Sequence, residues 1–314
     1  MKAAKVTVAL ILITFISSLV FLIYQTALEF PPVPIEDVVS PLSGTQNLIK
    51  VNFANIFPRS KSFDSEFRVF SQKISAKKGI YGVYIKDLLN NKTYRINENK
   101  EFYAASLFKT PQAITAMRQV EKGTMTLETV LTYKPEDYTD GSGTLNYNEQ
   151  GSSYTLDQVL TALLKQSDNV AQNMLLRTLP KSDLQLSFDK LVADPKKSKF
   201  LSSNISTPLE QGIYYENFYK TDFVSHESKK YLLELMSETS FDDRISNQLD
   251  PKVNFAHKIG NWAETGSWHD CGIVYGQSTE LVVCVMSEET TYEEFLTVGE
   301  YVSDFINFIV SEQK

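Results

Sequence analysis

The sequence predicts an α+β domain in which a five-stranded antiparallel sheet is flanked by helices and joined to an all-helical lobe, with a transmembrane helix at the N-terminus. Two strand-like runs, 80–85 and 93–96, flank Asn90-Asn91 in the manner of a hairpin. Three more lie within residues 253–286, and the segment between the two groups has the apolar spacing of helices. Amphipathic patterns at both ends of this region are expected to form helices that face the sheet.

Residues 1–28 are predicted to form a short cytoplasmic stub and a transmembrane anchor. No residue from 6 to 28 is charged, and a run of about 20 apolar residues is long enough to cross a bilayer as a helix. Lys2 and Lys5 precede the run and Glu29 follows it, so the positive-inside bias predicts a single-pass protein of the cell membrane with its domain outside the cytoplasm. The alternative is a cleaved signal peptide, but no small-x-small pair follows the run.

Residues 29–61 are predicted to be a linker, because Pro31, Pro32 and Pro34 remove backbone donors and force extended backbone. The folded domain is expected to occupy residues 62–314. With 42% hydrophobic residues the chain can bury a full core. Its net charge of −7 argues against a nucleic-acid partner, which rewards basic surfaces. We expect a monomer.

The helical lobe is expected from clear helix starts and stops. A helix that opens near residue 106 should run to about residue 121, with Gly123 as its stop. Thr155-Leu-Asp-Gln158 is a capping box, and Thr207-Pro-Leu-Glu210 starts another helix with proline in its first turn. The polar stretch around Asp140-Gly-Ser-Gly143 is predicted to be a loop.

The helix near residue 106 carries the first candidate catalytic residues. Lys109 follows Ser106 by three positions, so both side chains should lie on one helix face. A lysine that burial keeps partly neutral can take the proton of a serine hydroxyl, and the start of a helix favours the negative charge that develops when serine attacks a carbonyl. The pattern alone is weak, because Ser75-Ala-Lys-Lys78 also matches it.

Together with two further motifs, the Ser-x-x-Lys pattern becomes a specific signal. Ser167-Asp-Asn169 lies between two predicted helices, and Lys258-Ile-Gly260 lies on a predicted strand. In order and spacing the three motifs resemble the signature of class A β-lactamases and penicillin-binding proteins. The resemblance covers most of residues 62–313 and implies the β-lactamase/transpeptidase-like fold. It also implies a serine hydrolase that opens β-lactam amides through an acyl-enzyme, with no cofactor and no metal.

The resemblance assigns the proton-transfer roles. Ser106 would be the nucleophile, and Lys109 would accept its proton directly or through water. Ser167 would pass a proton to the departing nitrogen. Lys258 would raise the positive potential around these groups and attract a substrate carboxylate.

It also assigns the substrate-binding roles. Asn169 would hydrogen-bond the side-chain amide of the substrate, while Asp168 is expected to tie its loop to the backbone. The backbone N–H groups of Ser106 and Asn261 would form the oxyanion hole. Gly260 would leave room for substrate against the strand.

Two positions depart from the family pattern. Ile259 stands where the family has threonine or serine, so a hydroxyl that would bind the substrate carboxylate is missing. Class A β-lactamases also use a glutamate in a Glu-x-x-Leu-Asn loop to activate the deacylating water. No glutamate lies between Ser167 and Pro208, and matching Asn204 to the loop asparagine puts Phe200 in the place of the acid. We therefore expect intact acylation and weak deacylation.

These departures keep two other functions open. One is a DD-peptidase or penicillin-binding protein that acts on cell-wall peptides ending in D-Ala-D-Ala. The other is a catalytically silent module that binds β-lactam or peptide, although such a module has no physical need for two lysines near one another.

The residues around Cys271 leave two structural questions open. A zinc site at His257, His269, Asp270 and Cys271 is disfavoured, because adjacent residues on a strand point to opposite faces. Cys271 and Cys284 lie on neighbouring predicted strands, where they could form a disulfide or remain buried thiols.

Overall fold

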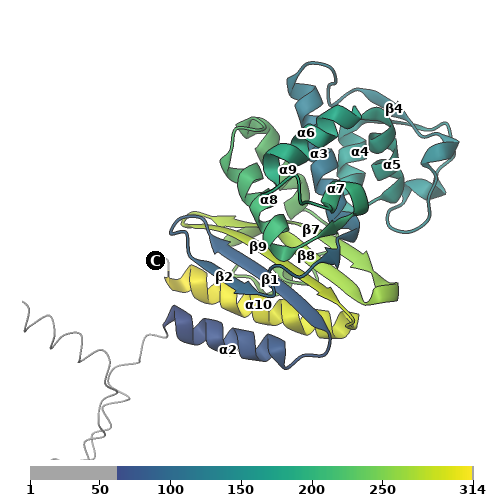
Figure 1. The fold of residues 1–314 in the computed structure, drawn as a ribbon. Helices are drawn as coiled ribbons and strands as arrows, with labels where there is room; N and C mark the ends of the chain where they lie inside the picture. The colour runs from purple at the N-terminus through teal and green to yellow at the C-terminus, as the bar shows by residue number, and fades with distance from the viewer. Residues whose placement is uncertain (1–61, 313–314) are drawn as a thin grey trace, which may run out of the picture. The chain divides into compact units, whose positions relative to one another are not determined.

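Residues 62–312 are described by the computed structural model, in which helices cover both faces of one sheet (Figure 1). The sheet is antiparallel throughout and has the strand order β2-β1-β9-β8-β7. Its strands are β1 (Ile80–Asp87), β2 (Thr93–Ile96), β7 (Val253–Trp262), β8 (Ser267–Gly276) and β9 (Thr279–Glu288). The early hairpin and the late three-stranded unit of the predicted five-stranded sheet are both confirmed.

Side chains that alternate along each strand separate two cores. Val83 points toward α2 (Phe63–Ser75) and α10 (Tyr292–Glu312), which lie side by side against one face of the sheet (Figure 1). The next residue, Tyr84, points to the opposite face and joins the core of the helical lobe. The amphipathic patterns at the two ends of the domain therefore form the predicted helices.

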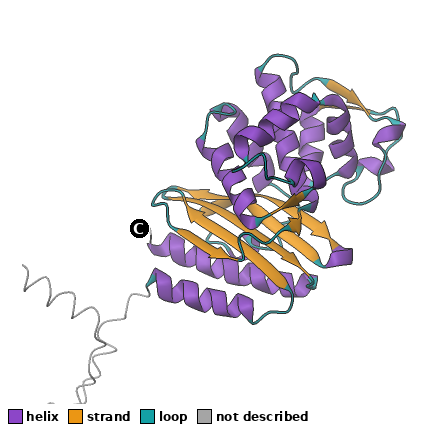
Figure 2. Cartoon of the chain, in the orientation of Figure 1, coloured by secondary structure: helices purple, strands orange, loops and turns teal. Residues whose placement is uncertain are grey.

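The remaining helices form the lobe on the other face of the sheet (Figure 2). They are α3 (Lys109–Glu121), α4 (Leu156–Lys165), α5 (Asn169–Thr178), α6 (Lys181–Leu191), α7 (Phe200–Ser203), α8 (Pro208–Lys220) and α9 (His226–Ser237). Short strands pair within the lobe and beside it: β3 (Phe102–Tyr103) with β6 (Ile205–Ser206), and β4 (Val130–Thr132) with β5 (Ser153–Thr155). Single 3₁₀ turns are η2 (Ala105–Phe108), η3 (Pro135–Asp137), η4 (Leu145–Tyr147), η5 (Ser246–Gln248) and η6 (Ala263–Thr265).

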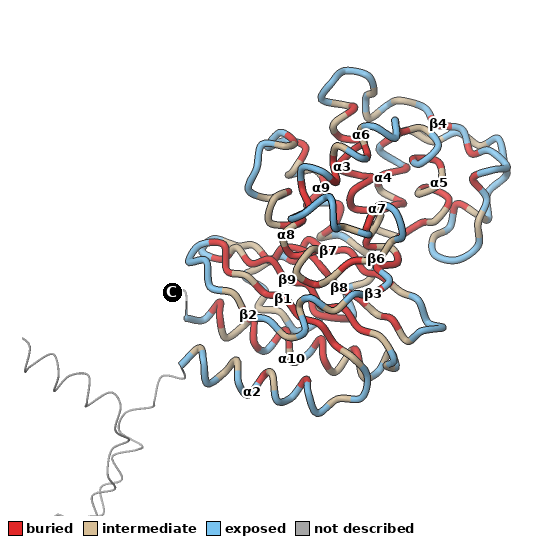
Figure 3. The backbone as a smooth tube through the Cα atoms, in the orientation of Figure 1, coloured by how far each residue is buried: buried red, intermediate tan, exposed pale blue. Residues whose placement is uncertain are grey.

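Helix α8 of the lobe packs against the sheet, and buried residues are concentrated at this contact (Figure 3). Gly212 makes this contact possible, because a Cβ at that position would lie 2.1 Å from the ring of Tyr84. The predicted cap of α8 is present, with the N–H of Glu210 donating to Thr207 Oγ1 at 3.0 Å. The capping box of α4 is present as well, since Thr155 and Gln158 each accept from the backbone N–H of the other.

The start of the helix that was expected near residue 106 differs from the prediction. Ser106 lies in the 3₁₀ turn η2, and the α-helix begins only at Lys109. Ala105, at the start of this turn, has a left-handed φ of 50°, and its carbonyl accepts a hydrogen bond from Asn204 Nδ2 at 3.0 Å. A residue in that conformation cannot belong to a regular α-helix, so no α-helix can extend back through it.

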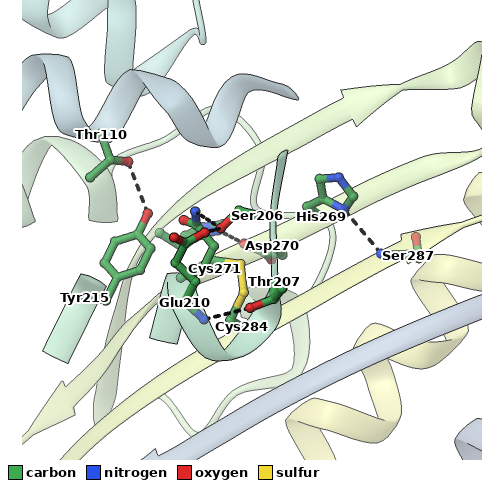
Figure 4. The surroundings of a disulfide bond; sticks show 12 residues. Thr110, Ser206, Thr207, Glu210, Tyr215, His269, Asp270, Cys271, Cys284 and Ser287 are labelled. Atoms are coloured by element: carbon green, nitrogen blue, oxygen red, sulfur yellow. Dashed lines mark hydrogen bonds and ion pairs between the residues drawn. A yellow bond between two sulfur atoms is a disulfide. The ribbon is translucent and has the colours of Figure 1, made fainter. Parts of the chain in front are cut away.

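Cys271 and Cys284 form a disulfide (Figure 4). They are direct partners in the pairing of β8 with β9, and both are fully buried. Lys258 is the partner of Cys271 on β7, so the disulfide and this lysine lie on the same face of the sheet. The bridge thus links β9 to β8, the strand that pairs with the one carrying Lys258.

No helix within residues 62–312 is long and apolar enough to cross a membrane. The predicted anchor at 6–28 and the predicted linker at 29–61 lie outside the described residues. The division of the chain into anchor, linker and domain therefore stays a prediction.

Candidate active site

The amine of Lys109 joins the first two predicted motifs. Its Nζ lies 3.0 Å from Ser106 Oγ, 3.1 Å from Ser167 Oγ and 2.6 Å from Asn169 Oδ1. It also donates to the backbone carbonyl of Ser167. An ammonium has only three protons for these four contacts. A neutral amine can instead accept a proton from one of the two hydroxyls, which is the geometry that general-base catalysis requires.

Burial sets the charge of Lys109. The side chain is fully buried, and desolvation lowers its pKa to about 7, although the negative charge of Asp168 opposes the shift. A lysine with that pKa is neutral in a large fraction of molecules at neutral pH. Ser106 itself is only partly buried.

The pKa of Lys109 predicts the pH dependence of acylation. Because the neutral amine is the base and its pKa is about 7, the acylation rate should rise nearly tenfold per pH unit at acidic pH and level off above roughly pH 8. Stopped-flow or quench measurements of acylation with one penicillin, from pH 5 to pH 9, would test this. A rate that is flat or falls across the acidic range would contradict it.

Asp168 holds the segment that carries Ser167 and Asn169. Its side chain caps α5 by accepting from the N–H of Ala171 at 2.8 Å, and it accepts from the N–H groups of Thr144 and Leu145 at 2.7 and 2.9 Å. The carboxylate therefore ties the loop before α4 to the start of α5, as the sequence suggested.

Asn169 is fixed from both ends of its amide. Oδ1 accepts from Lys109, and Nδ2 donates to the backbone carbonyl of Asp140 at 3.0 Å. The loop around Asp140 thus forms one side of the site, and Asn169 connects it to the base.

Lys258 lies inside the protein on β7. It is 1% exposed, and its Nζ donates to the carbonyl of Ile259 at 3.2 Å. Within residues 62–312 no carboxylate lies within ion-pair distance of it. Burial first, and then the positive charges of Lys109 and Arg244, hold its pKa well below the usual range, while Asp270 opposes them.

Gly260 brings β7 against the segment that leads to the nucleophile. A Cβ on this residue would lie 2.7 Å from the carbonyl oxygen of Ala104. The backbone of Gly260 and Asn261 therefore lies beside the residues before Ser106. The expected oxyanion hole, formed by the N–H groups of Ser106 and Asn261, requires these two segments to be close. The seven predicted site residues fall in one region of the fold.

A family model described as the Beta-lactamase enzyme family matches residues 66–306. The chain belongs to this family. It is a serine β-lactamase-like hydrolase, as its resemblance at the sequence level implied.

Curated relatives of this family member include the β-lactamase VEB-1 of Pseudomonas aeruginosa, which is 22% identical over 78% of the chain and 90% of the relative. A β-lactamase of Phocaeicola vulgatus is 24% identical over 75% of the chain and 76% of the relative.

Solved structures share the fold. PBP-A has a TM-score of 0.69 at 21% identity and covers 79% of this chain and 96% of its own. A β-lactamase from Sphaerobacter thermophilus has a TM-score of 0.68 at 22% identity, over 77% of this chain and 95% of its own.

This family member carries a buried arginine that the sequence reasoning missed. Arg244 is 2% exposed; it donates to Asn261 Oδ1 and to the carbonyl of His269, both at 2.7 Å. Its Nε has no hydrogen-bond partner within residues 62–312. No motif marks this residue in the sequence, because Arg244 lies in a polar segment shortly before the turn η5.

Phe200 is the residue that the sequence match put in the place of the deacylating acid. Phe200 is fully buried, with ring centroids 5.7 Å from Phe108 and 5.1 Å from Phe188. The nearest later glutamate, Glu210, accepts from the hydroxyl of Ser206 at 2.5 Å and lies in the first turn of α8. Of the described carboxylates, none hydrogen-bonds Ser106 or Lys109.

The residues of the disfavoured zinc site are occupied with other partners. His257 Nδ1 lies 2.6 Å from Asp270 Oδ1, and His269 Nε2 lies 2.8 Å from the carbonyl of Tyr103. Burial lowers the pKa of His269 to about 4, so this imidazole is neutral. Within residues 62–312 no group of three or more His, Cys, Asp or Glu side chains could hold a metal ion.

Proposed function

We propose that this chain opens β-lactams by forming an acyl-enzyme at Ser106 and that it releases the product slowly. The observation that carries the proposal is the Lys109 amine, which has a pKa of about 7 and lies 3.0 Å from Ser106 Oγ and 3.1 Å from Ser167 Oγ. A mutant of PBP-A, which shares the fold with a TM-score of 0.70, has been solved as an acyl-enzyme with penicillin G.

The proposed acylation moves one proton in a closed path. Ser106 Oγ attacks the lactam carbonyl carbon while Lys109 takes the hydroxyl proton. The backbone N–H groups of Ser106 and Asn261 stabilise the oxyanion. When the C–N bond breaks, the nitrogen takes the proton of the Ser167 hydroxyl, and Lys109 returns a proton to Ser167. The amine is then neutral again.

Positive charge is available for a substrate carboxylate. Lys258 and Arg244 are both buried. Among the described residues Arg244 has one long ion pair, 3.9 Å from its Nε to Asp243, and no ion pair of Lys258 is found. Burial and the charges of Lys109 and Arg244 lower the pKa of Lys258, and an anion bound beside it would favour its charged form. Arg244 and a Lys258 charged in this way can compensate for the hydroxyl that Ile259 lacks.

Slow release follows from Phe200. Hydrolysis of an ester needs a base that activates water, and the phenyl ring of this residue is packed among other aromatic rings. The same observation favours a second candidate function, that of a penicillin-binding protein or DD-peptidase, because such a protein is trapped by β-lactams rather than turning them over.

We also propose that residues 6–28 anchor the chain in the membrane, that 29–61 form a linker and that the domain from 62 onward acts outside the cytoplasm. The uncharged run and its flanking lysines support this arrangement.

A fluorescent penicillin tests the function and the location together. Added to intact cells that express the full-length chain, it should label the protein in the membrane fraction, and the label should persist after excess reagent is removed. The Ser106→Ala chain should carry no label. Turnover of a chromogenic cephalosporin should stay well below about 10 per second, which is typical of enzymes.

Equal labelling of the wild-type and Ser106→Ala chains would contradict the acyl-enzyme. Turnover at about 10 per second or faster would contradict slow release. Label in the soluble fraction alone would contradict the anchor. Release of D-alanine from a peptide ending in D-Ala-D-Ala would assign the DD-peptidase activity.

A further inference from the structure

Two large aromatic side chains are left exposed beside the nucleophile. Tyr103 at the end of β3 is 41% exposed and Trp262 at the end of β7 is 44% exposed. Their rings meet edge to face, with centroids 5.6 Å apart. Neither residue takes part in the acylation chemistry described above.

The backbone of both residues is held close to the site. Tyr103 comes three positions before Ser106, and its carbonyl lies 2.8 Å from His269 Nε2 on β8. Its strand β3 is also paired with β6, where Tyr103 lies opposite Ile205. The backbone next to Tyr103 also lies close to β7, because a Cβ on Gly260 would lie 2.7 Å from the carbonyl oxygen of Ala104.

Strand alternation gives the direction of the Trp262 side chain. Lys258, Gly260 and Trp262 are separated by two residues each and so share one face of β7. At a rise of about 3.3 Å per residue, Trp262 lies roughly 7 Å beyond Gly260 and about 13 Å from Lys258 along the strand. Lys258 and the aromatic pair thus lie at opposite ends of the segment that faces the nucleophile.

The proposed chemistry orients the substrate along this segment. The leaving nitrogen must lie near its proton donor Ser167, and the leaving-group carboxylate near Lys258. The acyl part of the substrate must then extend the other way, past Asn261 and toward the two rings.

We propose that Tyr103 and Trp262 form an aromatic subsite that binds a flat, apolar substituent on the acyl part of the substrate. This inference rests on the proposed function, and it makes the chain selective for acyl donors that carry an aromatic group. Edge-to-face and stacked ring contacts are the interactions that such a pair offers, and each should be worth about two- to tenfold in the acylation constant.

The test compares benzylpenicillin with 6-aminopenicillanic acid, which has the same ring system and no acyl substituent. Intact-protein mass spectrometry gives the second-order acylation constant of the full-length chain for each. In Trp262→Ala and in Tyr103→Ala, the ratio of the two constants should fall about two- to tenfold, with the constant for 6-aminopenicillanic acid nearly unchanged. Trp262→Phe should retain most of the ratio.

Leu89→Ala is the matched control, because Leu89 is 55% exposed in the turn after β1, and it should leave both constants unchanged. An unchanged ratio in the Tyr103 and Trp262 variants, or an equal fall in both constants, overturns the subsite while the acyl-enzyme stands.

If neither reagent acylates the chain, the proposed function is wrong, and the subsite is then tested by binding alone. The chain has two tryptophans, so the fluorescence of Ser106→Ala can be followed with phenylacetylglycine. Quenching that acetylglycine does not cause, and that Tyr103→Ala abolishes, upholds the subsite. Equal responses to the two compounds overturn it.

Discussion

Replacing Lys109 with methionine is expected to slow the acylation of Ser106 by about 10²- to 10⁴-fold, the usual contribution of a general base. Methionine keeps an unbranched chain of similar length but has no amine to take the hydroxyl proton. The constant for acylation by benzylpenicillin, measured by mass spectrometry of the intact protein, is the direct readout.

The variant Lys109→Arg distinguishes the effect of losing the base from the effect of losing the positive charge. Arginine keeps a positive charge but cannot be deprotonated in a protein, so this variant should be as slow as Lys109→Met. Lys122→Met is the control on the same helix, because Lys122 is the C-cap of α3 and is paired at the surface with Asp183. Its acylation should match that of the wild type, and a Lys109→Met chain acylated at the wild-type rate would exclude this lysine as the base.

The sequence predicted those features whose causes are local or periodic. Short strand-like runs separated by turn residues predicted the three-stranded unit of β7, β8 and β9. Such runs are strongly apolar because one face of each strand packs on the side of α10 and the other on the lobe. The capping box at Thr155 predicted the start of α4 for the same local reason. Motif order then predicted that Ser106, Lys109, Ser167 and Asn169 would meet, and the distances to Lys109 Nζ agree.

Features that depend on distant parts of the chain could not be predicted in this way. Ser106 follows a residue with left-handed backbone, Ala105, whose carbonyl accepts a hydrogen bond from Asn204, 99 residues away. Arg244 approaches the site only because η5 packs against α10, and no periodic pattern marks that contact. The disulfide remained undecided until the register of β8 and β9 placed Cys271 directly opposite Cys284.

The lowered pKa of Lys109 could not be predicted from the sequence either. Ser-x-x-Lys predicts that the amine can reach the hydroxyl, but a pKa of about 7 requires that the lysine be fully buried, with Asp168 close enough to oppose the shift. Both conditions come from the packing of α5 against α3. The charge of this base therefore depends on tertiary packing that the motif alone does not describe.

Asp168→Ala is expected to lower the free energy of unfolding by about 3–5 kcal/mol, because it removes the acceptor of several buried N–H groups. The carboxylate accepts from Ala171, Thr144 and Leu145, and it is 1% exposed. Urea denaturation of the full-length chain would measure the loss. Asp189→Ala, on the exposed side of α6, should change stability by less than about 0.5 kcal/mol.

The same substitution should change catalysis in a way that simple destabilisation would not. Asp168 raises the pKa of Lys109 against the effect of burial, so without this carboxylate the neutral amine persists to lower pH. Under conditions in which Asp168→Ala remains folded, its acylation rate should level off at a lower pH than that of the wild type. Asp168→Asn keeps one acceptor oxygen but no charge, so it should retain more stability and show the same displacement. A pH profile that coincides with the wild type in both variants would show that Asp168 holds the loop without setting the charge of the base.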